Sequence, residues 1–157
     1  PWSGVESPFG FSPSGSPAPW LPQPADWKDR TAQAQTGDPH SMLELYRTLL
    51  HLRAARPSLH RGSLRLRPAD PSAPDVLVYE RVDDLADGSG VEGETAETGE
   101  TTLGAVNFGA EPATVAVPSG AAPLATTDPA VAVTDDRVRL PAHTAAVLSV
   151  PAAGPGA

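Results

Sequence analysis

The stretch that decides the fold of this chain is Val76-Leu77-Val78-Tyr79-Glu80-Arg81-Val82. It is rich in valine and leucine and is bounded by aspartates, which is typical of a short β-strand. Similar short runs recur through the second half of the sequence, at residues 64–67, 102–108, 114–117, 130–133, 137–140 and 145–150. Short strands that follow one another closely between turn residues predict an antiparallel β-sandwich. We therefore expect a sandwich domain over residues 62–150.

One stretch of this domain, residues 83–100, differs in composition. It holds seven acidic residues and no basic one, together with several glycines and threonines. A segment so acidic and so poor in large apolar side chains does not bury enough surface to fold. We predict that residues 83–100 form a disordered, solvated hairpin insertion. The last residues, 151–157, are expected to be a disordered tail.

Before the sandwich, residues 38–55 have the apolar periodicity of a helix. Apolar side chains recur at three- and four-residue spacings, at Met42, Leu43, Leu45, Tyr46, Leu49, Leu50 and Leu52. This arc predicts a helix with one buried face. Asp38 and Pro39 suit its start, and Ser41 with Glu44 offers a capping box one turn later. Pro57 ends the helix, because proline disfavours helical geometry in the residue before it.

Two arginines near the end of this helix occupy different positions relative to its apolar arc. Arg53 falls in the apolar arc, where an unpaired charge would be costly. We predict that a carboxylate or a carbonyl group meets it, most simply in a structural ion pair. Arg56, on the next turn, is interpreted as a surface cation.

The first 37 residues combine seven prolines with all three tryptophans and two of the three phenylalanines. A flexible linker is rich in glycine, serine and charge, and it is poor in large aromatic residues. The segment is therefore interpreted as an irregular loop that lies against a surface. We expect that surface to lie outside this chain.

The composition excludes several classes of protein. With 157 residues, the chain can form one ordinary domain, or a small domain with flanking segments. A net charge of −8 argues against a nucleic acid or an anionic membrane as partner. The absence of cysteine excludes disulfides, thiolate metal ligands and cysteine nucleophiles. Since no apolar run approaches the roughly 18 residues of a membrane span, we expect a soluble chain.

Residues that commonly carry catalysis do not form a convincing site in this sequence. No Gly-x-Ser-x-Gly elbow is present. His40, Glu44 and His51 share the polar side of the predicted helix, and we interpret them as a solvated face rather than a metal site. We predict no metal ion and no cofactor. Acidic residues that lie close together in the sequence are expected to point apart on loops: Asp26 and Asp29, Asp83 and Asp84, Asp135 and Asp136.

A series of motifs nevertheless runs in order along the chain. They are Pro1-Trp2, Gly10-Phe11-Ser12, Pro19-Trp20-Leu21-Pro22, Trp27, Gln35, Asp38-Pro39-His40-Ser41-Met42-Leu43, Tyr46-Arg47, Leu49-Leu50-His51-Leu52-Arg53, Pro57-Ser58-Leu59, Gly62, Val76-Leu77-Val78-Tyr79-Glu80-Arg81, Asn107-Phe108-Gly109 and Leu140-Pro141. In this order they resemble the carboxyl-terminal end of the α-glucosidases of glycoside hydrolase family 13, the α-amylase superfamily. The resemblance covers residues 1–150, with 83–100 unmatched.

The resemblance implies that the chain joins the end of a (β/α)8 barrel to the all-β antiparallel sandwich that follows it. Residues 1–61 would be the last loop and the closing helix of the catalytic barrel, and residues 62–150 the sandwich. The chain as a whole would be mainly β with one long helix. The aspartate nucleophile, the glutamate acid/base and the second aspartate of the family lie on earlier barrel strands and have no matching position here. We therefore predict no catalytic residue in this chain.

By the same resemblance, the full enzyme would release terminal α-linked glucose from short oligosaccharides with retention of configuration. The residues expected nearest to the sugar are Trp2, Phe9, Phe11 and Trp20, because aromatic faces suit the apolar faces of pyranose rings. Packing of the loop on the barrel wall is the other interpretation of these side chains. It is preferred for Trp20 and Trp27, and the two interpretations balance for Trp2 and Phe11.

Two other functions remain open at this point. One is a trehalose synthase-like isomerase of the same superfamily, because the residues that decide between hydrolysis and transfer would precede Pro1. The other is a free-standing β-sandwich carbohydrate-binding module, which would need exposed tryptophans on its strands, whereas all three precede the helix. The resemblance implies a cytoplasmic location. The sequence indicates neither the preferred linkage nor the oligomeric state.

Overall fold

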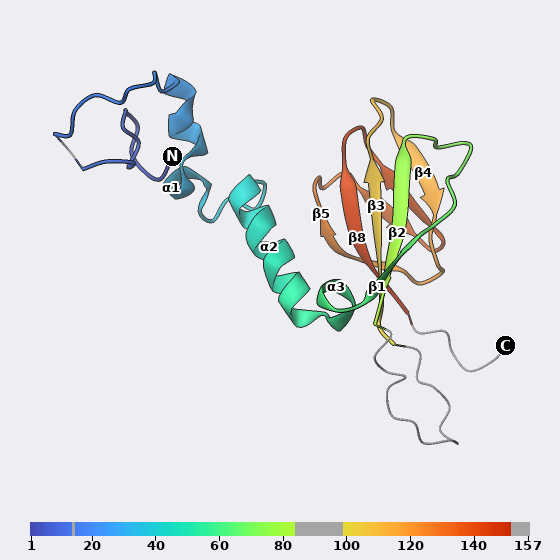
Figure 1. Cartoon of the computed structure of the whole chain (residues 1–157). Coiled ribbons are helices and arrows are strands. Elements are labelled where there is room, and N and C mark those ends of the chain that lie inside the picture. Colours follow the sequence, from blue (N-terminus) through green and yellow to red (C-terminus); the bar gives the residue numbers. More distant parts are fainter. Residues whose placement is uncertain (14, 84–98, 152–157) are drawn as a thin grey trace, which may run out of the picture. The chain divides into compact units, whose positions relative to one another are not determined.

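The structure is a computed structural model that describes residues 1–13, 15–83 and 99–151 (Figure 1). Two compact units share the chain, Pro1–Thr48 and Leu49–Ala157, and the division falls inside the long helix α2 (Met42–Ala55). The domain boundary predicted from the resemblance, between a barrel end at residues 1–61 and a sandwich at residues 62–150, is a different division and stays a prediction. Across the described residues, the helices are all too short or too polar to span a membrane.

The second unit contains two antiparallel sheets (Figure 1). The larger has the strand order β1 (Ser63–Leu66), β2 (Val76–Val82), β3 (Thr101–Asn107), β8 (Ala145–Val150) and β5 (Ala122–Thr126). The smaller has the order β4 (Ala113–Ala116), β7 (Arg137–Leu140) and β6 (Ala132–Thr134). Neighbouring strands are antiparallel in both sheets. The predicted antiparallel sandwich is therefore confirmed, and the chain is mainly β with one long helix.

The core lies where the inner faces of the two sheets meet. Leu103 on β3 and Leu148 on β8 are register partners, and both are fully buried. From the smaller sheet, Val138 and Leu140 of β7 are equally buried, while the residues that alternate with them are exposed. A buried side chain of this size stabilises the fold by about 1.5–3 kcal/mol. Period-two alternation thus builds the core from both sheets.

Three predicted strands match the observed bounds: Val76–Val82, Arg137–Leu140 and Ala145–Val150. The others begin or end one or two residues away, and β5 was not predicted at all. Asp135 and Asp136, which the sequence placed on a loop, form the hairpin turn that joins β6 to β7, because Thr134 at the end of β6 pairs with Arg137 at the start of β7.

The predicted acidic insertion lies largely outside the described residues, which omit 84–98, and so does the predicted tail beyond Pro151. The two ends of the insertion are described, and they are specifically bonded. The amide of Asp83 donates to the carbonyl oxygen of Glu100 at 2.9 Å, which extends the pairing of β2 with β3. The prediction of a solvated segment is therefore wrong at Asp83 and Glu100, because arginines meet both carboxylates.

These arginines come from the segment around the short helix α3 (Pro57–His60). Arg61 donates to both carboxylate oxygens of Asp83, and Arg56 pairs with Glu100. Beside these pairs, the hydroxyl groups of Ser58 and Thr102 lie 2.7 Å apart in a buried hydrogen bond. The contacts fasten α3 to the ends of β2 and β3. Arg56 is thus part of the sandwich's support, and its interpretation as a surface cation was wrong.

The helix α2 differs from its prediction in its start and its partners. It begins at Met42 rather than at residue 38, because the hydroxyl oxygen of Ser41 accepts the amide of Glu44. No residue of α2 is buried in the described chain. Arg53, on the apolar side of α2, is exposed and forms no hydrogen bond or ion pair among the described residues. The expected partner of Arg53 is absent here because the apolar face that carries it is itself uncovered.

Candidate functional site

The first unit is built around a tight loop that brings Trp2 and Phe9 together. The amides of Trp2 and Ser3 both donate to the carbonyl oxygen of Phe9, at 2.8 and 3.2 Å. Phe9 has a φ of 47°, in the left-handed region that a phenylalanine rarely adopts. Gly10 follows with a φ of 75°, and a Cβ atom there would lie 2.6 Å from the hydroxyl of Ser3. The chain therefore needs glycine at this point for Trp2 and Ser3 to approach so closely.

A second set of bonds holds the same strap, residues 1–4, from the other side. Ala32 and Gln33 donate their amides to the carbonyl oxygens of Pro1 and Trp2, at 3.1 and 3.0 Å. These donors lie at the start of α1 (Ala32–Gln35), whose first turn Thr31 caps by accepting the amide of Ala34. Free amides at the first turn of a helix thus find their acceptors in the strap. The sequence-based interpretation of residues 1–37 as an irregular loop missed both α1 and the 3-10 helix η1 (Ala25–Arg30).

Trp27, on η1, packs against two phenylalanines at once. Its ring centroid lies 6.2 Å from that of Phe9 and 6.1 Å from that of Phe11, with both pairs tilted. Such tilted pairs are favourable aromatic contacts. Phe9 is 2% exposed behind Trp27, whereas Phe11 remains 51% exposed. The segment therefore supplies an internal partner for two of its own aromatic residues, contrary to the expectation that the surface lies wholly outside the chain.

An apolar groove of about 470 Å³ opens beside this cluster. Trp2 and Phe11 line it from the strap and loop, Met42 and Tyr46 line it from α2, and Arg30 and Gln35 add polar groups. Trp2, Met42 and Tyr46 are each more than 60% exposed. All of these residues belong to the first unit.

Gln35 links the loop part of the groove to α2. Its side-chain oxygen accepts the amide of Leu43 at 3.1 Å, and its side-chain amide donates to the carbonyl of Arg30 at 2.8 Å. The backbone carbonyl of Gln35 also accepts the hydroxyl of Ser41. One side chain thus fixes η1, α1 and the start of α2 relative to one another. The groove is therefore pre-formed on its polar side.

The structure places the four sugar-contact candidates in three different environments. Trp2 and Phe11 lie together on the groove. Phe9 is buried behind it, because its ring is covered by Trp27. Trp20 is 95% exposed, and the groove does not include it. Sequence reasoning missed Trp27 as the support of the cluster and Tyr46 as part of the groove. The signal for Tyr46 was its place in the apolar arc predicted for residues 38–55.

The described part of the chain does not assemble a metal centre. In residues 1–13, 15–83 and 99–151, no three His, Asp or Glu side chains lie close enough together to hold a metal ion. The backbones of Asp83 and Glu100 are hydrogen-bonded to each other. Their carboxylates form ion pairs with Arg61 and Arg56, respectively. The groove itself contains no carboxylate. What the site offers is apolar and aromatic surface with hydrogen-bonding groups at its edge.

Comparison of the fold with solved structures finds extended similarity. The trehalulose synthase MutB from Pseudomonas mesoacidophila MX-45 matches with a TM-score of 0.65 and 29% sequence identity over 85% of this chain. A MutB mutant in complex with sucrose matches at 0.62 and 30% identity over 84% of this chain. Another mutant, in complex with glucose, matches at 0.63 and 30% over 85%.

In each case the chain spans only 22% of the length of the enzyme that it matches. No family model matches the chain, and no curated protein matches its sequence. The similarity in fold covers most of this chain, and a sequence identity of 29–30% accompanies it. It supports the placement of this chain as a part of an enzyme of glycoside hydrolase family 13, the α-amylase superfamily.

Proposed function

We propose that the chain is the carboxyl-terminal part of a retaining α-glucosidase, which releases terminal α-linked glucose from short oligosaccharides. The observation that carries this proposal is the aromatic groove of the first unit, in a chain similar to family 13 enzymes over most of its length. The last loop and helix of a barrel would bring such a groove to the face where barrel active sites lie.

The groove would hold the leaving-group sugar. Trp2 and Phe11 present exposed aromatic surface, which suits the apolar C–H faces of a pyranose ring. Gln35 and Arg30 stand at the edge, where sugar hydroxyl groups need hydrogen-bond partners. Trp27 and Phe9 would keep these surfaces in place from behind. The groove would therefore position the substrate, and the bond-breaking groups would come from the rest of the enzyme.

A retaining mechanism needs two carboxyl groups about 5 Å apart, one to attack the anomeric carbon and one to protonate the leaving oxygen. Among the described carboxylates, those with close partners are held by arginines or by local hydrogen bonds. We therefore assign both catalytic groups to the part of the enzyme that precedes Pro1. A cytoplasmic location belongs to the same proposal.

Isomerisation is a second candidate, because the matched structures are named trehalulose synthase. After the glucosyl–enzyme intermediate forms, water attacks it in a hydrolase. In an isomerase, a different hydroxyl group of the retained leaving sugar attacks the same carbon. An aromatic groove that holds the leaving sugar would serve both reactions, since it decides how long that sugar stays.

The test is to assay the full-length protein that contains this chain with maltose, isomaltose and sucrose, and to separate the products by chromatography. Release of free glucose supports the hydrolase, whereas a new disaccharide of unchanged mass supports the isomerase. No reaction with any of the three would overturn the proposal. The 157-residue chain is expected to be inactive on the same sugars. Turnover that is abolished by mutating an acid of this chain would refute the assignment of the chemistry.

A further inference from the structure

The sandwich contains a second hollow, at the side where its two sheets face each other. It has a volume of about 360 Å³ and lies between β2 and β4, below the segment that connects β1 to β2. Val76 and Val78 line it from β2, and Val115 and Ala116 line it from β4. Val76 and Val115 belong to the buried core. The floor of the hollow is therefore the apolar interior of the sandwich.

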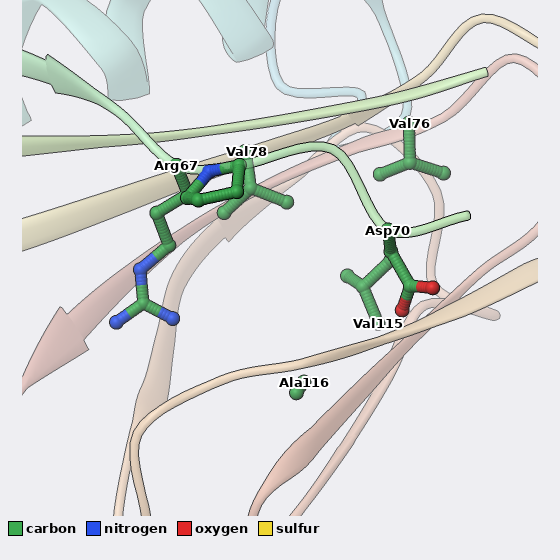
Figure 2. A pocket seen from close by; sticks show the side chains of 7 residues that line it. Arg67, Asp70, Val76, Val78, Val115 and Ala116 are labelled. Carbon is green, nitrogen blue, oxygen red and sulfur yellow. The ribbon is translucent and has the colours of Figure 1, made fainter. Parts of the chain in front are cut away.

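Two charged side chains border this floor. Figure 2 shows Arg67 and Asp70 at opposite ends of the opening, with Val78 and Val115 between them. Both come from one short segment of the β1–β2 connection. A ligand that filled the hollow would therefore meet a donor at one end, an acceptor at the other and apolar surface in the middle.

Both side chains are held in place by their own neighbours. Arg67 donates its Nε to a carboxylate oxygen of Glu80 at 2.8 Å, and its Nη2 lies 2.7 Å from the same oxygen. The Oδ1 atom of Asp70 accepts the amide and the hydroxyl of Ser72, at 2.8 and 2.6 Å. Little conformational entropy would be lost when a ligand binds, because these groups are already fixed.

The charges at the opening also select the ligand class. Glu80 neutralises Arg67, and the Oδ1 atom of Asp70 is already hydrogen-bonded to Ser72. An anion at Arg67 would have to compete with Glu80, and a cation at Asp70 would have to compete with the hydrogen bonds from Ser72. A neutral molecule that carries hydroxyl groups would not, since a hydroxyl both accepts from a guanidinium and donates to a carboxylate. The apolar floor in turn favours a ring with exposed C–H bonds.

We propose that this hollow, which we call the β2–β4 site, binds a single neutral hexose unit, such as the end of a glucose-containing saccharide. Its volume is at the small end of the roughly 300–1,000 Å³ typical of ligand pockets, which suits one sugar ring. The site lies in the sandwich and does not depend on the groove of the first unit. It would give the protein a second hold on a saccharide.

The test is a titration of the 15N- and 13C-labelled 157-residue chain with glucose and with maltose, observed by NMR. We expect shifts of the Arg67, Asp70, Val78 and Val115 resonances, with a dissociation constant on the order of 1 mM, the weak end of specific binding. Contacts between sugar protons and the methyl groups of Val78 and Val115 should appear as intermolecular nuclear Overhauser effects. Inorganic phosphate and glycine serve as anionic and zwitterionic probes. If either of them shifts these resonances and the sugars do not, the proposal is overturned.

Two variants sharpen this result. Ala116→Leu should fill the hollow and weaken sugar binding about tenfold or more, the loss of about 1.4 kcal/mol. Thr114→Leu, at an exposed position of the same strand outside the lining, is the matched control and should bind like the unmodified chain. Equal binding by Ala116→Leu and Thr114→Leu would overturn the site, and so would contacts of the sugar with Trp2 and Phe11 alone.

Discussion

Phe9, which is buried, packs against the half-buried Trp27, with their ring centroids 6.2 Å apart at an angle of 54°. Phe9 holds its left-handed backbone while its carbonyl oxygen accepts the amides of Trp2 and Ser3. A strained residue keeps such a conformation only where its surroundings fix it. The packing of Trp27 on Phe9 is thus what presents Trp2 on the groove.

The first prediction concerns Trp27→Ala in the 157-residue chain. Without the indole ring, the loop should lose its fixed conformation, and the amides of Trp2 and Ser3 should exchange with solvent about tenfold faster or more. Amide hydrogen exchange measures this directly. Trp27→Phe should lie between the two, because it keeps an aromatic partner for Phe9. Trp20→Ala is the control: Trp20 is 95% exposed, so its replacement should leave these amides unchanged. Equal exchange in all variants would contradict the role of Trp27.

The second prediction concerns the pair of Arg61 and Asp83. Two hydrogen bonds of 3.1 and 2.9 Å join them in a forked geometry, and the side chain of Asp83 is only 9% exposed. Arg61→Ala should lower the thermal midpoint of the sandwich, because it removes the cation that faces a nearly buried carboxylate. Arg61→Lys should recover part of the loss, since lysine keeps the charge without the fork. Arg47→Ala removes an arginine from an exposed helix pair and should change the midpoint little. A larger effect of Arg47→Ala than of Arg61→Ala would refute this ranking.

The third prediction concerns Asn107, at the end of β3. Its side-chain amide donates to the carbonyl oxygens of Glu111 and Pro141, both at 2.9 Å, and its oxygen accepts the amide of Gly109. Asn107 is 2% exposed, so its replacement leaves several polar groups unsatisfied away from water. Asn107→Ala should reduce the free energy of unfolding by about 1–3 kcal/mol, measured by urea denaturation. Asn107→Asp, which removes the two donors, should be destabilising as well. Stability unchanged in both would show that these bonds add nothing.

The fourth prediction is a pH dependence at Asp70. Hydrogen bonds from the hydroxyl and the amide of Ser72 lower the pKa of Asp70 below its ordinary value. A depressed pKa in the folded state means that the contribution to stability is present above the unfolded-state pKa of about 3.9 and is lost as the pH falls through the folded value. Ser72→Ala should therefore raise the pKa of Asp70, as followed by the NMR shift of its carboxyl carbon. Ser149→Ala, on a different strand, should not move it. A pKa of Asp70 that is the same in both variants would contradict the assigned cause.

The strands that sequence patterning located to the residue are those with the densest local signal. Val76–Val82 lies between aspartates, and Arg137–Leu140 follows a two-aspartate turn. β5 escaped prediction because its sequence, Ala122-Pro123-Leu124-Ala125-Thr126, has weak strand propensity and contains a proline. It exists because it pairs with β8 through an irregular register at Pro123 and Ala125. The paired residues lie 20 to 27 positions apart in the sequence, so no local pattern indicates the pairing.

The candidate site shows the same limit. The concentration of aromatic residues in the first 37 positions indicated that the segment must pack, and two of its members, Trp2 and Phe11, do share the groove. The sequence did not predict which aromatic residues are buried. Trp27 contacts Phe9 and Phe11, which are sixteen or more residues away in the sequence. The arginine assignments failed for a related reason. Helical periodicity placed Arg53 in the apolar arc, but the partner of Arg56, Glu100, lies 44 residues away.

The place of β8 in the larger sheet constrains when the sandwich can form during protein synthesis. β8 pairs with β3 on one side and β5 on the other, so the five-stranded sheet is incomplete until residues 145–150 have left the ribosome. Until then, β3 and β5 expose unpaired backbone edges, which are prone to pair with other chains. The loop cluster of residues 1–48 has no such delay, because its contacts close within its own length. A nascent chain that stalls before β8 should therefore depend on chaperones for its second unit.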